Sequence, residues 1–165
     1  MIKIVSLVLL FLSSGYLGFQ ISKIFEEKQN FYLDLLDFTN CVKNEIAFVK
    51  TDILTILNKY HYKSNFNDFL NEYKFMLESK NVGKERLLKM LDDISNFDDV
   101  EKNCIAQMFF DLGNIGYYEQ LENLNFCAEN YKQSLEKSRD KSLKFIPLSK
   151  KMGFLVGLLI CIILI

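Results

Sequence analysis

The two ends of the chain constrain its fold most strongly, because both are apolar and the middle is not. The last sixteen residues, 150–165, start with two lysines and continue for fourteen residues without a charge. A helix packed on a soluble domain keeps one polar face, and this segment has none. Fourteen residues make about 21 Å of helix against a hydrocarbon core of about 30 Å. Because paired lysines lengthen the effective span by snorkelling, we expect a short C-terminal transmembrane segment over 150–165.

The N-terminal segment is longer and equally apolar. Lys3 is the only charge before Lys23, and residues 4–22 would form about 28 Å of helix. A cleaved signal peptide is the rival interpretation, with its cleavage site at the small residues 13–15. The apolar run continues beyond these small residues, which favours a retained transmembrane helix over residues 1–23.

The placement of basic residues predicts the orientation. Only Lys3 lies outside the two apolar segments, whereas several basic residues flank their inner ends: Lys23, Lys28, Arg139, Lys141, Lys144, Lys150 and Lys151. The positive-inside rule then predicts a two-pass cell-membrane protein with a cytoplasmic central domain and both termini outside. Glycines at close spacing, Gly15 with Gly18 and Gly153 with Gly157, are candidates for transmembrane helix packing. Ordinary glycine content of membrane helices explains them equally well.

The central region, residues 24–149, has the pattern of a helical bundle. It holds 16 basic and 21 acidic residues, and the whole chain has only seven glycines and one proline. Apolar residues recur at spacings of three and four over 25–60 and 117–144, with shorter helical stretches between them. The predicted fold class is all-α, a small antiparallel bundle flanked by an N-terminal and a short C-terminal transmembrane helix.

Local signals predict where some helices begin and end. The aspartates Asp98 and Asp99 favour a helix N-terminus, and Gly113 is a natural left-handed residue at a helix C-terminus. Pro147 is expected to kink or break the helix before the C-terminal segment.

No catalytic pattern is present in the sequence. It contains no nucleotide-binding glycine loop, no zinc-protease or serine-hydrolase motif, one histidine (His61) and four cysteines without a CxxC pair. The net charge of −1 gives no basis for a nucleic-acid partner. We therefore expect a protein that is not an enzyme, with no cofactor, metal site or small-molecule substrate.

The whole chain resembles the stage III sporulation protein AB family of endospore-forming bacteria. The resemblance rests on a few short segments: Gly18-Phe19, Asn44-Glu45-Ile46, Leu112-Gly113 followed by Gln120, and Gly153–Leu159. Pro147 departs from the family pattern just before the last of these segments.

The resemblance implies a membrane platform or assembly component of the secretion-like complex that links mother cell and forespore. Its cytoplasmic part would resemble the platform protein of type II secretion and type IV pilus systems. The implied partners are the cytosolic ATPase of that complex (stage III sporulation protein AA) and its other membrane components. The implied location is the mother-cell membrane around the forespore.

Three positions carry this expectation as interaction or structural candidates: Glu45, Gly113 and Gln120. Capping or bridging within the bundle is an alternative role for Glu45 and Gln120. A second function, from a different class, is an exported helical binding module that has lost its signal peptide and is tethered by its C-terminal segment.

Overall fold

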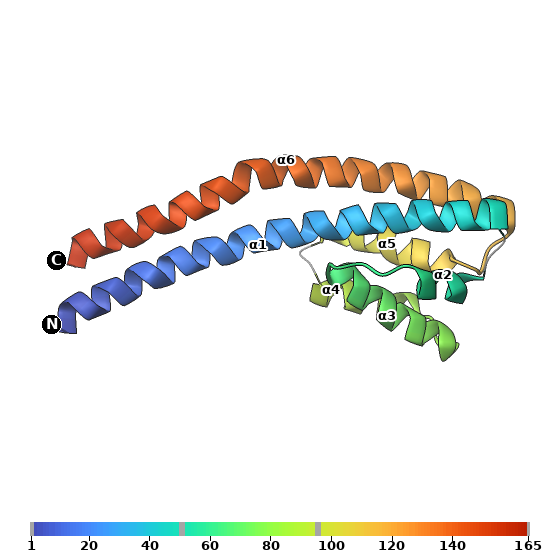
Figure 1. Cartoon of the computed structure of the whole chain (residues 1–165), viewed down its shortest axis with the longest axis horizontal. Coiled ribbons are helices and arrows are strands. Elements are labelled where there is room, and N and C mark those ends of the chain that lie inside the picture. Colours follow the sequence, from blue (N-terminus) through green and yellow to red (C-terminus); the bar gives the residue numbers. More distant parts are fainter. Residues whose placement is uncertain (1, 50–51, 95–96, 165) are drawn as a thin grey trace. The chain divides into compact units, whose positions relative to one another are not determined.

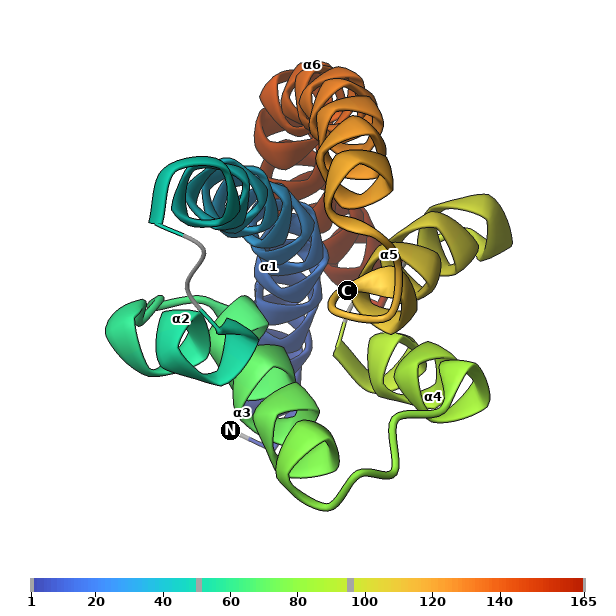
Figure 2. The same ribbon diagram turned by 90° about the vertical axis from the view of Figure 1, so that its right-hand side faces the viewer.

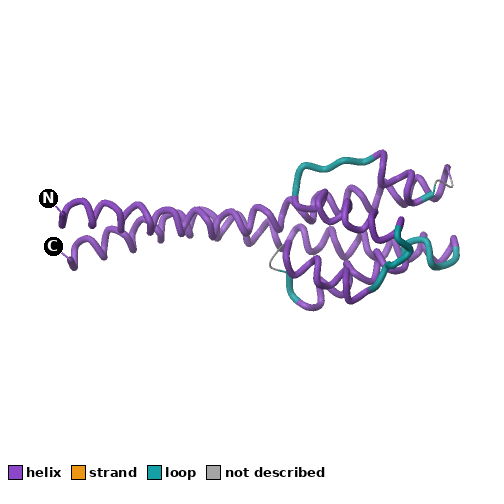
Figure 3. Tube along the Cα trace, turned by 90° about the horizontal axis from the view of Figure 1, so that it is seen from below, coloured by secondary structure: helices purple, strands orange, loops and turns teal. Residues whose placement is uncertain are grey.

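A computed structural model describes residues 2–49, 52–94 and 97–164, and this part of the chain contains helices and loops without a strand (Figure 3). The all-α prediction is therefore confirmed. The order along the chain is α1 Ile2–Asn44, a π-helical segment Glu45–Val49, α2 Ile53–Lys59, α3 Asn65–Glu78, α4 Lys84–Ile94, α5 Asp99–Asp111 and α6 Tyr117–Leu164 (Figure 1).

The chain divides into two compact units, and the long helices α1 and α6 contribute to both. The bundle unit is Asn30–Glu136, and the paired-helix unit consists of Met1–Gln29 and Lys137–Ile165. Different kinds of side chain pack the interior of each unit.

Aromatic side chains fill the core of the bundle unit. Phe31 of α1 lies edge-on to Phe66 of α3 and to Phe97, with ring centroids 5.1 and 4.9 Å apart. Phe38, about two helical turns further along α1, stacks on Phe109 of α5, with ring centroids 5.7 Å apart. Offset and edge-on ring pairs are the favoured arrangements for such contacts. Around this core, α3 packs against α2 and α4, and α4 packs against α5 (Figure 2).

Side-chain caps fix where the short helices begin. Asp52 accepts from the Leu54 N–H at the start of α2, and Ser64 accepts from the Phe66 N–H at the start of α3. The start of α5 is a capping box in which Asp98 accepts from the Glu101 N–H at 2.8 Å and Glu101 accepts from the Asp98 N–H at 2.8 Å. These bonds satisfy amide donors that have no partner inside the helix.

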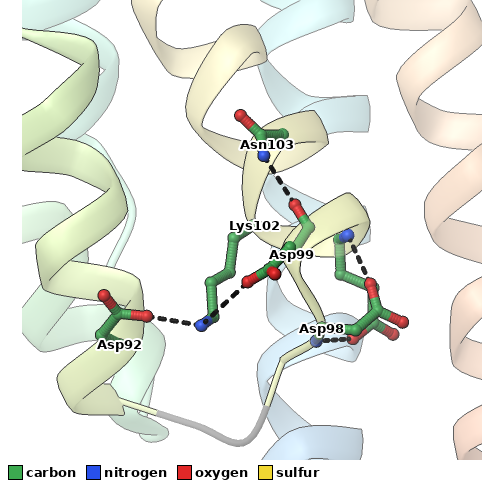
Figure 4. A network of polar contacts seen from close by, with 6 residues as sticks. Asp92, Asp98, Asp99, Lys102 and Asn103 are labelled. Atoms are coloured by element: carbon green, nitrogen blue, oxygen red, sulfur yellow. Dashed lines mark hydrogen bonds and ion pairs between the residues drawn. The ribbon is translucent and has the colours of Figure 1, made fainter.

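One lysine joins α5 to the helix before it. Lys102 pairs with Asp92 of α4, and its Nζ lies 3.8 Å from the Asp99 carboxylate (Figure 4). Asn103 donates to the Asp99 backbone carbonyl at 2.8 Å in the same network. The aspartates predicted to mark this helix start therefore act as a cap and as an ion-pair partner.

The paired-helix unit buries small side chains and exposes large apolar ones, the reverse of the bundle unit. Among its residues with described burial, the buried ones are all glycine or serine: Gly18, Ser22, Ser138, Ser142 and Gly157. Large apolar side chains of both helices are exposed instead, including Leu12, Leu17, Phe154, Leu155 and Leu159. Many large apolar side chains therefore face outward, and the buried small residues lie where the two helices meet.

The two helices of this unit run antiparallel and touch through their backbones (Figure 1). A Cβ atom placed on Gly18 would lie 2.7 Å from the Ser149 carbonyl oxygen and 3.2 Å from the Gly153 Cα. Two serines of α1 also donate to carbonyls of α6: Ser14 Oγ to Gly153 at 2.6 Å and Ser22 Oγ to Ile146 at 3.4 Å. Small residues at four-residue spacing allow such close approach.

The two long helices are continuous. Helix α1 runs from the apolar N-terminal segment into the bundle without an interruption. Helix α6 contains Pro147, which was expected to kink or break it, and continues to Leu164, so Pro147 does not break the helix. A proline removes one backbone donor, and that local loss does not end a helix whose neighbouring turns pack along their length.

By length and apolarity, no helix within residues 2–49, 52–94 and 97–164 qualifies as able to cross a membrane. The two flanking transmembrane helices of the predicted fold therefore have no support from this criterion.

Candidate docking site at the α5–α6 turn

The turn between α5 and α6 is built around Gly113. Its φ of 84° lies in the left-handed region, where a residue with a side chain is strained. Carbonyls near the end of α5 are also satisfied: Asn114 Nδ2 of the turn donates to the Phe110 carbonyl at 2.6 Å, and Tyr73 Oη of α3 donates to the Phe109 carbonyl at 2.8 Å. Gly113 therefore acts as the left-handed residue that the sequence predicts at this helix end.

A π-helical turn at the end of α1 lies beside the start of α6. Residues Glu45–Val49 adopt this wider helix, which displaces carbonyls from the regular bonding pattern. Tyr117 Oη, in the first turn of α6, donates to the Ala47 carbonyl at 3.2 Å. This bond ties two segments that are 70 residues apart in the chain. Short π-helical turns are frequent at functional sites.

A pocket of about 710 Å³ opens between these segments. Its lining comes from the π-helical turn, the start of α2, the α5–α6 turn and the first turns of α6: Ile46, Asp52, Ile53, Gly113, Tyr117, Tyr118 and Gln120. The structure thus brings Gly113 and Gln120 to one pocket. We call these seven residues, together with the neighbouring Phe48, the docking site.

Gln120 is the unusual member of the docking site. Its side chain is 8% exposed, and its Nε2 is buried without a hydrogen-bond partner among the described residues. Its backbone N–H is satisfied by the Gly116 carbonyl at 2.8 Å, so only the side-chain donor lacks a partner. A buried unsatisfied donor costs about 1–3 kcal/mol, which a ligand acceptor would recover.

Exposed aromatic side chains accompany the pocket. Phe48 and Tyr118 are each 85% exposed, and the Tyr117 and Tyr118 rings meet edge-on at 5.2 Å. Large exposed aromatics beside a partly apolar hollow are typical of protein-binding surfaces, where tyrosine is enriched among the residues that dominate affinity.

Glu45 has a different role from Gly113 and Gln120. Its side chain pairs with Lys59 at the end of α2 and accepts from Tyr60 Oη at 3.3 Å. The hydrogen bond and negative charge of Glu45 raise the pKa of Lys59. Glu45 therefore bridges α1 to α2, while its neighbour Ile46 lines the pocket.

A second hollow uses the same turn and is acidic. It has a volume of about 480 Å³ and is lined by Asp111, Ile115, Glu119, Glu122, Asn123 and Phe126. Asp111 is held by Gln107 Nε2 at 2.8 Å and by Asn123 Nδ2 at 3.4 Å. Three carboxylates around an exposed phenylalanine favour a basic partner surface.

The four glycines predicted to pack membrane helices all lie in the paired-helix unit. Gly18, Gly153 and Gly157 lie at the contact between α1 and α6, and a Cβ on any of them would come within about 3.1 Å of the other helix. Gly15 faces open space, with nothing within 4 Å of its Cβ position. The structure therefore brings three of the four together.

Several residues of the docking site have no counterpart among the sequence predictions. Ile53, Tyr117 and Tyr118 belong to the docking site. The only sequence signal that could have identified them is the pair of adjacent tyrosines at a helix start. Among the described residues, no group of three histidine, cysteine or acidic side chains could hold a metal ion.

Comparison with known proteins gives one match. No curated protein and no solved structure matches the chain significantly. The family model of stage III sporulation protein AB matches residues 3–165, so the chain belongs to this sporulation protein family.

Proposed function

We propose that this sporulation protein is a non-enzymatic, membrane-anchored assembly component of the complex that links mother cell and forespore. In this role its bundle unit docks the cytosolic ATPase of the complex, stage III sporulation protein AA, and its paired-helix unit contacts other membrane components. The bundle would then correspond to the cytoplasmic part of the platform protein of type II secretion and type IV pilus systems.

The observation that carries the docking role is the buried Gln120 donor in a pocket lined by Tyr118, with the exposed Phe48 two residues along the chain from the lining residue Ile46. A folded domain gains nothing from an unsatisfied buried amide or from two aromatic rings in water. Both features are explained by a protein partner that supplies an acceptor and covers the rings.

The contrast between the two units supports membrane anchoring. The bundle unit buries its aromatic residues, whereas the paired-helix unit buries glycine and serine and exposes leucine and phenylalanine. Outward apolar side chains around a small-residue helix contact are the arrangement that a bilayer favours. The family resemblance implies that this anchor lies in the mother-cell membrane around the forespore, and the positive-inside rule gives it two passes, a cytoplasmic bundle and both termini outside.

The exported module with a cleaved signal peptide is less well supported. Removal of residues 1–15 would delete Phe11, which lies edge-on to Phe154 at 4.7 Å, and Ser14, which bonds the Gly153 carbonyl. N-terminal sequencing of the mature protein distinguishes the two functions, because a start after Ser14 or Gly15 would favour export.

Partner binding is tested with the full-length protein in detergent and the purified ATPase. We expect Tyr118→Ala and Phe48→Ala each to weaken binding by about tenfold or more, as for central aromatic residues of an interface. Phe75→Ala is the matched control, because Phe75 is another exposed phenylalanine of the bundle unit (60%) outside the docking site. Wild-type protein that fails to bind the ATPase, or equal effects at all three positions, would refute the docking role.

A separate experiment tests the anchor. Cysteines introduced near residues 1, 100 and 165 of a cysteine-free protein are exposed to a membrane-impermeant thiol reagent in intact cells. Protection of the central position alone supports the proposed topology, and labelling of the central position contradicts it.

A further inference from the structure

Lysines are arranged along one side of α6 within the paired-helix unit. Lys137, Lys144 and Lys151 recur every seven residues and so lie on a similar side of the helix. The paired-helix unit contains nine basic and three acidic residues, a net charge of +6, and the bundle unit contains 11 basic and 18 acidic residues, a net charge of −7. Positive charge is therefore concentrated in the unit that also exposes apolar side chains.

The last lysine lies over an apolar hollow. An open hollow of about 490 Å³ is lined by Lys150, Lys151, Phe154 and Leu155. Phe154 and Leu155 follow the lysines by one helical turn, so both pairs lie on one side of α6. Two ammonium groups therefore stand at one end of a wall formed by exposed apolar side chains.

The protein neutralises these two lysines only in part. Lys150 Nζ lies 4.0 Å from the Glu26 carboxylate and 5.7 Å from the centre of the Phe19 ring. Lys151 makes no ion pair with any residue that the structure describes. The hollow therefore retains net positive charge at its polar end.

We propose that this hollow binds an anionic phospholipid, with the phosphate at Lys150 and Lys151 and one acyl chain along Phe154 and Leu155. The order of charge followed by apolar surface within two helical turns matches the order of headgroup and hydrocarbon in a lipid. An acidic peptide would satisfy the lysines and leave the apolar wall uncovered, so the lipid is the better fit. The inference rests on the proposed membrane anchor.

Native mass spectrometry of the full-length protein in detergent tests the inference. Phosphatidylglycerol or phosphatidylcholine with the same acyl chains is added, and retained lipid is counted. We expect phosphatidylglycerol to be retained about tenfold more than phosphatidylcholine, because each lysine near a headgroup contributes to attraction. The preference should disappear in Lys150→Gln/Lys151→Gln and fall at high salt. Excess inorganic phosphate should displace little lipid, because it cannot occupy the apolar wall.

The control is a variant that loses the same number of lysines from another part of the protein. Lys89→Gln/Lys132→Gln removes two exposed lysines from the bundle unit and should keep the lipid preference. Equal retention of both lipids by the wild type would overturn the inference, as would an unchanged preference in the Lys150 and Lys151 variant.

A vesicle-binding experiment distinguishes an error in the lipid-site inference from an error in the proposed membrane anchor. Wild type that enters phosphatidylcholine vesicles but shows no headgroup preference keeps the anchor and loses the lipid site. Wild type that enters neither neutral vesicles nor vesicles with about 30% phosphatidylglycerol contradicts the anchor itself.

Discussion

Gly18 of α1 and Gly153 of α6 are in backbone contact: a Cβ atom on Gly153 would lie 3.0 Å from the Gly18 Cα. A Cβ atom on Gly18 would lie 2.7 Å from the Ser149 carbonyl oxygen, a distance that real Cβ atoms almost never show, and these neighbours cannot rotate away because they belong to the main chain. The pair therefore sets the distance between the two helices of the paired-helix unit.

Gly18→Ala should destabilise the contact between these helices. The added methyl group forces the helices apart, and overpacking of this kind costs about 1–3 kcal/mol. Thermal unfolding of the purified protein, followed by circular dichroism, measures the effect. Gly15→Ala is the matched control, because Gly15 has nothing within 4 Å of its Cβ position and should lose no stability. Equal melting temperatures for the two variants would contradict the role of Gly18.

Gln120→Leu should separate stability from function. Leucine fills a similar volume and removes the unsatisfied Nε2, so the free energy of unfolding should rise by about 1 kcal/mol. The proposed ATPase affinity should fall in the same variant, because the donor offered to the partner is gone. Chemical denaturation and a binding titration measure the two effects.

Gln107→Leu is the comparison for this prediction. Gln107 accepts from Lys84 Nζ at 2.7 Å and donates to Asp111 Oδ1 at 2.8 Å, so its loss should lower stability by about 1 kcal/mol. A Gln120→Leu protein that is destabilised as much as Gln107→Leu would mean that Gln120 is an ordinary structural residue.

Local sequence signals predicted the parts of the fold that depend on neighbouring residues. The apolar spacing around Phe38, the helix start at Asp98 and Asp99 and the left-handed Gly113 are each determined within about four residues, and each is present. Continuity of α6 depends on packing along the whole helix, so the proline rule alone does not tell whether Pro147 breaks it, and the helix continues through this residue.

The docking site was only partly predictable. Gly113 and Gln120 were identified through the family resemblance, but the pocket also needs Ile46 and Ile53 from segments at least sixty residues earlier. Serines as well as glycines mark the side of α1 that contacts α6, and a search for glycine pairs alone did not identify this side. Ser14, Gly18 and Ser22 recur every four residues, and this stripe excludes Gly15.

Asp98→Ala should lower stability more than Asp99→Ala. Asp98 caps α5 through a 2.8 Å bond to the Glu101 N–H, and loss of such a cap costs about 1 kcal/mol. The Asp99 side chain is 96% exposed and pairs with Lys102 at 3.8 Å, an interaction that contributes little in water. Urea denaturation of both variants measures the difference. A larger loss for Asp99→Ala would show that charge near the helix start outweighs the cap.

The Cys104 thiol should react at lower pH than the Cys41 thiol. A hydrogen bond from Cys127 lowers the pKa of Cys104 below its usual value, whereas burial and the nearby Asp37 charge raise the pKa of Cys41. The thiolate is the reactive form, so between pH 7 and 8 a larger fraction of Cys104 is reactive. In a Cys161→Ser background, peptide mass spectrometry after brief iodoacetamide treatment should show faster modification at Cys104.

Cys127→Ala gives the control for this pH dependence, because alanine cannot donate to the Cys104 sulfur. In the variant, burial, which raises the pKa of Cys104, outweighs the smaller lowering by Tyr131, so the modification rate of Cys104 near pH 7 should fall while that of Cys41 stays constant. An unchanged pH profile for Cys104 would show that the Cys127 hydrogen bond does not stabilise the thiolate.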